Sequence, residues 1–133
     1  RELQKICFLI GESFTKVSNR GSLYGRLYKE RKAWEEMQNE NLAYAEQAAK
    51  MLKEHNYGKD TDTFKYLSKG MLSPAHINRR SQRYATKIFL THFFEACYID
   101  KYQKEPPVIY PIAHLNHEDY IKPEVPYDQL WRK

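Results

Sequence analysis

The sequence contains little glycine, little cysteine and no long hydrophobic run. With five glycines in 133 residues, it has little material for a loop that wraps around phosphate groups. The nucleotide-binding motifs G-x-x-x-x-G-K-[ST] and G-x-G-x-x-G, the hydrolase motif G-x-S-x-G and the zinc-protease motif H-E-x-x-H are all missing. No motif assigns the chain to an enzyme class, so an enzyme is the less favoured interpretation.

Cys7 and Cys97 lie far apart and match no metal-ligand spacing, which favours two buried thiols in a reducing compartment; a single disulfide between them stays open. The apolar run 6–10 is much shorter than a signal-peptide core or a membrane span. We therefore expect an intracellular, cytoplasmic protein with no membrane partner. The chain begins with Arg1 and not with methionine, so it is open whether it belongs to a larger chain or assembly.

What the sequence does contain is typical of a folded domain. Charged residues make up 29% and aromatic residues 14% of the chain, and a disordered chain would have few large rings to bury. A chain of 133 residues fits one domain that buries roughly two-thirds of its unfolded surface. We divide it into a helical bundle, residues 1–104, and an extended proline-rich arm, residues 105–133.

Apolar residues recur at steps of three and four before the arm begins, as on the buried stripe of a helix. The first stripe consists of Leu3, Ile6, Cys7, Ile10, Phe14 and Val17. A second helix is predicted over residues 22–56, with Trp34 and Met37 on its buried stripe. The polar step at residues 38–41 interrupts this stripe, so a kink or a break is open there.

The fourth predicted helix has the clearest start signal. Ser73 can cap it, and Pro74 at the first helical position loses no needed amide bond. It extends to about Lys101 and follows a short third helix within residues 61–70. Its second half, residues 88–99, is apolar on nearly every side, and such a helix has to be covered on every side. The predicted fold is all-α: a bundle of about four helices around the central helix 88–99.

The arm has too many apolar residues for an idle linker. Five of the six prolines lie between Pro106 and Pro126, and proline ends helices and favours extended geometry. We expect the arm to lie along a groove, either on its own bundle or on a neighbouring protein. The residues expected to bind a partner there are Val108, Ile109, Tyr110, Ile112 and Trp131.

Positive charge is concentrated in two segments of the helical part. Residues 16–32 carry six basic residues and one acidic residue, and residues 69–87 carry five basic residues and no acidic one. Arginine can donate two hydrogen bonds to one phosphate, and tyrosine can stack on an exposed base. The candidate nucleic-acid-binding residues are Arg79, Arg80, Arg83, Tyr84 and Lys87 in one cluster and Arg26, Lys29, Arg31 and Lys32 in the other. The alternative is that both clusters are solvated helix faces, or partners of acidic residues such as Glu35.

Two groups of histidines and carboxylates are candidate metal or catalytic sites. His92 and Glu95 lie on adjacent turns of the central helix, but their order is the reverse of the usual bundle metal motif and no second copy is present. We expect them to satisfy buried polar partners, such as each other or an arginine. His114 and His117 precede two carboxylates with which they could bind zinc, although exposed polarity is the favoured interpretation. We expect no metal and no cofactor.

These observations favour a non-enzymatic helical binding subunit of a larger nucleoprotein complex, whose basic helix faces contact DNA or RNA phosphates. The alternative is a protein-interaction or adaptor module whose apolar arm docks on a partner protein. An enzyme that uses His92, Glu95, His114 or His117 is a third interpretation. A protein partner is expected under the first two interpretations, and nucleic acid only under the first.

Overall fold

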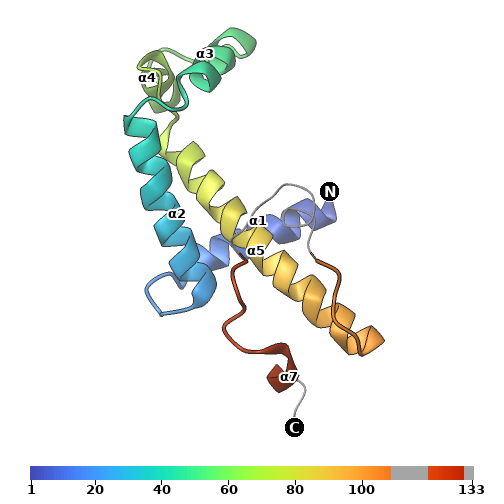
Figure 1. Cartoon of the computed structure of the whole chain (residues 1–133). Coiled ribbons are helices and arrows are strands. Elements are labelled where there is room, and N and C mark those ends of the chain that lie inside the picture. The colour runs from blue at the N-terminus through green and yellow to red at the C-terminus, as the bar shows by residue number, and fades with distance from the viewer. Residues whose placement is uncertain (109–119, 131–133) are drawn as a thin grey trace.

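The computed structural model describes residues 1–108 and 120–130, and Figure 1 shows how their helices are arranged. The described residues contain no strand, which confirms the predicted all-α class. No helix among them is long and apolar enough to cross a membrane. The helices are α1 (Glu2–Lys16), α2 (Leu23–Glu40), α3 (Ala45–Glu54), α4 (Asp62–Ser68), α5 (Pro74–Tyr102) and the four-residue α7 (Tyr127–Leu130).

Three of these helices begin with a hydroxyl side chain that caps the first turn. The side chains of Ser22, Thr61 and Ser73 each accept a hydrogen bond from the backbone N–H three residues later, at 3.2, 3.3 and 3.4 Å. Pro74 occupies the first turn of α5, where its missing N–H has no helical partner to lose. The start predicted for this helix is therefore confirmed.

The predicted second helix, residues 22–56, is divided into α2 and α3. The chain turns after Glu40, and Leu42 adopts the left-handed conformation with a φ of 58°. Asn39 lies in the polar step and bonds to the backbone of Leu72: its Nδ2 donates to the carbonyl at 2.9 Å, and its Oδ1 accepts from the N–H at 2.7 Å. The break therefore occurs where Asn39 holds the segment that leads into α5.

The helices form two packed groups. Helices α2 and α5 run in opposite directions and pack together, and α1 crosses α5 and contacts both. Helices α3 and α4 pack on each other beyond the end of α2 and the start of α5 (Figure 1). The long helix α5 thus belongs to both groups.

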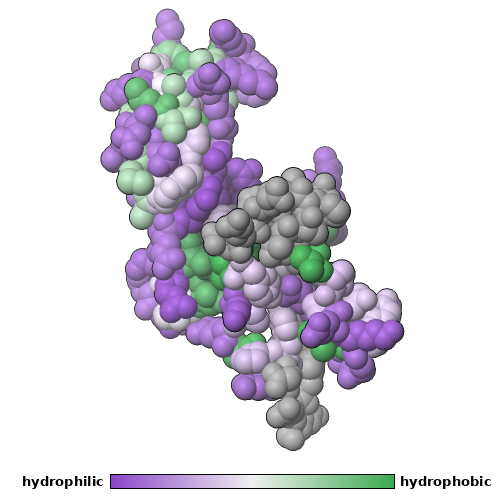
Figure 2. Space-filling model, in the orientation of Figure 1, coloured by the Kyte–Doolittle hydropathy of each residue, from purple (hydrophilic) through white to green (hydrophobic). Residues whose placement is uncertain are grey.

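Each group has a small hydrophobic core. Where α1, α2 and α5 meet, the buried residues are Phe14, Tyr28 and Ala85. Around α3, α4 and the start of α5, they are Ala48, Leu67, Leu72 and Ile77. Hydrophobic surface also stays open to solvent on the face drawn in Figure 2, beside hydrophilic surface. Both hydrophobic cores of the described residues include a residue from the first half of α5.

The prediction that residues 88–99 are covered on every side is wrong. Phe93 and Phe94 are 58% and 49% exposed, whereas the buried side chains in this stretch are His92 and Glu95. The reason is length: α5 has 29 residues and its antiparallel neighbour α2 has 18, so the last turns of α5 extend beyond their neighbours (Figure 1). An apolar helix surface predicts burial only if another element is long enough to cover it.

Helix α1 lies close to α5 at Gly11. A Cβ atom at this position would lie 3.1 Å from Gln82 Cβ and 3.2 Å from Thr86 Oγ1. Thr86 Oγ1 is buried at this crossing, and it is the one buried side-chain oxygen or nitrogen of residues 1–108 and 120–130 without a hydrogen-bond partner. A buried polar atom without a partner destabilises the fold, because it has lost its hydrogen bond to water.

Replacing this hydroxyl by a methyl group should stabilise the protein. We expect Thr86→Val to raise the free energy of unfolding by about 1 kcal/mol, because valine has the same shape and needs no hydrogen bond. Urea unfolding followed by circular dichroism measures the change. The matched control is Thr91→Val, whose hydroxyl donates to the Lys87 carbonyl at 3.1 Å on an exposed face. Destabilisation by Thr86→Val would show that its hydroxyl has a partner in solution.

Candidate nucleic-acid interface

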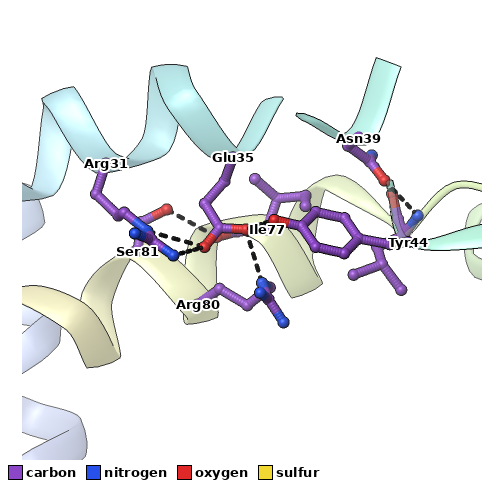
Figure 3. A network of polar contacts seen from close by, with 8 residues as sticks. Arg31, Glu35, Asn39, Tyr44, Ile77, Arg80 and Ser81 are labelled. Carbon is purple, nitrogen blue, oxygen red and sulfur yellow. Dashed lines mark hydrogen bonds and ion pairs between the residues drawn. The ribbon is translucent and has the colours of Figure 1, made fainter. Parts of the chain in front are cut away.

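The carboxylate of Glu35 is the centre of the polar contacts between α2 and α5 (Figure 3). It is 1% exposed. Its Oε1 accepts from Arg31 Nε at 2.9 Å and from Arg31 Nη2 at 2.7 Å, and its Oε2 accepts from Arg80 Nε at 2.7 Å and from the Tyr44 hydroxyl at 2.5 Å. We call these four residues the Glu35 clamp, because they join α2, α5 and the start of α3.

The clamp keeps Glu35 charged. Burial alone would raise the pKa of Glu35, but the hydrogen bonds from Tyr44, Arg80 and Arg31 outweigh it, so that the pKa lies below its usual value. Burial and the Glu35 carboxylate raise the pKa of Tyr44, which stays a hydrogen-bond donor. Burial alone would lower the pKa of Arg80, but Glu35 raises it. One negative charge is therefore shared by two positive charges.

A concavity of about 310 Å³ opens over the clamp, between α2 and α5. It is lined by Arg31, Glu35, Arg80, Arg83, Tyr84 and Lys87. Four of these side chains are cationic and one is anionic. Arg83 and Lys87 are exposed, and no ion pair joins either of them to another described residue. The concavity therefore has an excess of positive charge that is open to solvent.

Two aromatic rings lie close to Arg31, the arginine of α2 in this concavity. Tyr84 also lines the concavity, whereas Trp34 lines another one, of about 220 Å³, together with Arg31 and Tyr84. Arg31 Cζ lies 4.2 Å from the centre of the Trp34 ring and 4.8 Å from the centre of the Tyr84 ring. Trp34 is 42% exposed, although the sequence pattern placed it on the buried stripe of α2. Its position three residues after Arg31, on the same helix face, is the signal that could have identified it.

Arg79 of the first predicted cluster and the nearby His76 lie on the same helix but add no free positive charge to the concavity. Arg79 Nη1 lies 2.7 Å from Glu12 Oε1 and also donates to Gln82, so its charge is already paired. His76 lies one turn before Arg80. Burial, together with the charges of Arg83 and Arg80, lowers the pKa of His76, so that it adds no positive charge at neutral pH.

The residues of the second predicted cluster all lie on α2, but they do not line one common concavity. Arg31 joins the concavity described above, whereas Lys29 and Lys32 line a separate concavity of about 350 Å³ near the end of α1. Lys29 Nζ donates to Asn19 Oδ1 at 2.8 Å, and Lys32 Nζ lies 3.8 Å from a Glu36 carboxylate oxygen. Arg26 is exposed and lines neither concavity. The two clusters therefore do not converge as a whole.

His92 and Glu95 form a second buried polar network, with the segment that precedes α7. His92 Nε2 lies 2.6 Å from the Ile121 carbonyl, so this nitrogen carries the proton, and Nδ1 accepts from the Tyr24 hydroxyl at 2.8 Å. The Tyr120 hydroxyl donates to Glu95 Oε2 at 2.7 Å, and the Tyr127 hydroxyl donates to the same oxygen. The partners are tyrosines and a carbonyl, and not the arginine or the mutual contact that the sequence suggested.

The tyrosines of this network stay protonated. Burial and the Glu95 carboxylate raise the pKa values of Tyr120 and Tyr127. Burial and the charge of Glu124 raise the pKa of Tyr24. Within residues 1–108 and 120–130, no group of three or more histidine, cysteine, aspartate or glutamate side chains could hold a metal ion. The network therefore acts as a hydrogen-bonded attachment of this segment to α5.

Several predicted residues lie outside the described part of the chain. These are Ile109, Tyr110, Ile112 and Trp131 of the arm, and the group formed by His114, His117, Glu118 and Asp119. Val108 is the one predicted partner-binding residue within it, and this side chain is 65% exposed.

A comparison with known protein families, with curated proteins and with solved structures found no match.

Removing the central charge of the clamp should destabilise the fold. We expect Glu35→Gln to lower the free energy of unfolding by about 2–3 kcal/mol, because the substitution leaves Arg31 and Arg80 without their buried counter-charge. Urea unfolding at neutral pH measures the loss. Glu36→Gln is the matched control, because this neighbouring carboxylate is exposed and its contact to Lys32 is long, at 3.8 Å.

A comparison of wild type with Glu35→Gln at different pH values tests the charge of Glu35. Because its pKa is lower in the folded state than the value of about 4.3 in an unfolded chain, the clamp contributes its full stability above that pH. The contribution is lost as the pH falls through the folded-state pKa. The stability difference between wild type and Glu35→Gln should therefore shrink below about pH 4.3. A difference that stays constant there would contradict a charged Glu35.

The tyrosines that bind Glu95 should also matter for stability. We expect the double substitution Tyr120→Phe with Tyr127→Phe to lower the free energy of unfolding by about 3 kcal/mol, because a buried carboxylate loses two donors. Thermal unfolding measures the effect. The control is Tyr98→Phe with Tyr102→Phe, which removes two tyrosine hydroxyls near the end of α5, from rings whose centres are 4.7 Å apart and whose planes are tilted by 47°. Equal stability of the two double variants would show that residues 120–127 do not hold Glu95.

Proposed function

We propose that this protein is a non-enzymatic helical binding subunit of a larger nucleoprotein complex and that it contacts DNA or RNA phosphates through the concavity between α2 and α5. The observation that carries this proposal is the lining of the concavity, with four cationic side chains and one anionic side chain. Exposed positive charge in a concave site attracts the phosphate backbone of nucleic acid. The proposed contacts are Arg31, Trp34, Arg80, Arg83, Tyr84 and Lys87.

The Glu35 clamp supports this proposal through preorganisation. Arg31 and Arg80 are held in fixed positions by Glu35, so a phosphate that approaches them does not have to order two long side chains. The two arginines outnumber the carboxylate, and therefore they keep a net positive charge. Arg83 and Lys87 are one helical turn apart and present their charges to solvent. They are the main phosphate contacts in this proposal.

The aromatic rings support contact with an unpaired strand. Trp34 is exposed beside Arg31, and the Tyr84 ring also lies close to the same guanidinium group. Aromatic side chains next to cationic ones are the combination with which proteins bind single-stranded nucleic acid, because every base has a face that can stack. The base-stacking role falls mainly on Trp34, which sequence reasoning did not select.

The proposal is tested by oligonucleotide binding at several salt concentrations. We expect wild-type protein to bind a fluorescent single-stranded oligonucleotide, with an affinity that falls as salt rises. Arg83→Ala with Lys87→Ala should weaken binding and lower the salt slope by about 1.4, since each lost contact to a single strand accounts for roughly 0.7. Fluorescence anisotropy measures both quantities.

The matched control is Lys29→Ala with Lys32→Ala, which removes the same charge from the separate concavity near the end of α1. It should leave the affinity close to that of wild type. Equal weakening by the two double variants would mean that net charge and not the α2–α5 concavity determines binding. No salt-dependent binding by wild type at low salt would overturn the proposal.

A further inference from the structure

A second groove lies between α1 and α5, on the other side of Arg83 and Lys87. It has a volume of about 470 Å³, and Arg83 and Lys87 line both this groove and the α2–α5 concavity. Its walls include Cys7 and Phe8 from α1 and Leu90 from α5. Arg83 and Lys87 therefore form a ridge between the α2–α5 concavity and the α1–α5 groove. The two differ, because the floor of the groove is apolar.

The rim of the groove carries one sign of charge. Arg79, Arg83 and Lys87 line it at four-residue intervals, which places them in a row along α5 with steps of about 6 Å. None of the residues that line the groove is acidic. The Arg79 guanidinium is paired with Glu12 and lies over the Phe8 ring, 4.0 Å from its centre. Arg83 and Lys87 keep charges that a partner could neutralise.

The apolar surface of α1 continues beyond the groove. Leu3, Ile6 and Leu9 are 69%, 51% and 56% exposed, and Phe8 on the groove wall is 47% exposed. The sequence pattern predicted that Leu3 and Ile6 would be buried. Among the described residues, no element covers this end of α1, which extends past α5 (Figure 1). Exposed apolar surface of this kind, bordered by polar residues, is typical of a protein-binding site.

We propose that this groove binds an amphipathic helix of a partner protein, with the apolar face of that helix on Phe8 and Leu90 and its carboxylates facing Arg83 and Lys87. The groove follows α5 from Arg79 to Leu90, about 16 Å or three helical turns. A helix with acidic residues four positions apart repeats the spacing of the cationic row. An apolar floor with a charged rim is the pattern by which grooves recognise such helices.

The apolar floor and the cationic rim of the groove together indicate the class of ligand that it binds. Nucleic acid would match the cations but would leave the apolar floor unused, whereas an uncharged helix would match the floor and leave the cations unpaired. An acidic amphipathic helix satisfies both. The proposal does not depend on nucleic-acid binding, because it rests on the α1 side of the ridge.

The test starts from a displayed library of helical peptides about four turns long, selected on the immobilised full chain without nucleic acid. Enriched sequences should carry apolar residues at helical spacing and Asp or Glu residues four positions apart. Arg83→Glu with Lys87→Glu should weaken the enriched peptide by about tenfold or more, because the like charges then repel. Lys29→Glu with Lys32→Glu should not, since these lysines lie in another concavity.

The two cysteines locate the bound peptide. Cys7 lines the groove, whereas Cys97 is exposed on the later part of α5 and does not line it. A saturating amount of the enriched peptide should slow alkylation of Cys7 by N-ethylmaleimide and leave Cys97 unchanged, as measured by mass spectrometry. Failure to enrich any peptide, enrichment of peptides without acidic residues, or an unprotected Cys7 would each overturn the proposal.

A further variant separates this proposal from the nucleic-acid site. Leu90→Asp places a negative charge on the groove floor, outside the lining of the α2–α5 concavity. It should abolish peptide binding and leave oligonucleotide binding intact, with circular dichroism as the check that the protein is folded. The exposed pair Arg83→Glu with Lys87→Glu keeps the peptide test valid if Leu90→Asp is misfolded. Peptide binding that survives both changes would contradict the assigned groove.

Discussion

The buried carboxylate of Glu35 is the contact on which the described arrangement of helices depends. The two hydrophobic cores are small and lie at different places along α5. Glu35 joins α2 to α5 through Arg80 and to the start of α3 through Tyr44, so it connects the elements of both cores. Because a buried charge is stable only when it is paired, the two arginines are needed for the fold as well as for any ligand. Arg31 and Arg80 share part of their charge with Glu35, whereas no ion pair to a described residue reduces the charge of Arg83 or Lys87.

Buried polar side chains are also stabilised by hydrogen bonds near the other end of α5. His92 and Glu95 are buried under residues 120–127, and each has hydrogen-bond partners from elements distant in sequence. A buried apolar patch could hold this segment in several registers, but hydrogen bonds from Tyr120 and Tyr127 to one carboxylate oxygen fix its position. Residues 120–127 therefore pack on α5.

Sequence reasoning succeeded where the determining interaction is local. The start of α5 was predicted because Ser73 and Pro74 act within one turn, and the break after α2 coincides with a polar step in the sequence. Sequence reasoning failed where the burial of a residue depends on whether another helix covers it. Trp34 is on an apolar stripe, and Phe93 is on a helix segment that is apolar on nearly every side. Neither pattern says whether a neighbour is long enough to cover the residue. Glu35 was identified as a candidate partner of the basic residues. Its pairing with Arg31 is local, at i, i+4 spacing within α2, but its pairing with Arg80 required the packing of α2 against α5.

The ridge formed by Arg83 and Lys87 couples the two proposed sites. Both side chains line the α2–α5 concavity and the α1–α5 groove, so each charge can be neutralised from one side or from the other. A helix whose carboxylates occupy these cations removes the charge that a phosphate needs, and a bound strand does the same to the helix. Binding free energies are reciprocal, so the two ligands must weaken each other by the same factor. The coupling needs no change of conformation, because the shared charges on one face of α5 are sufficient.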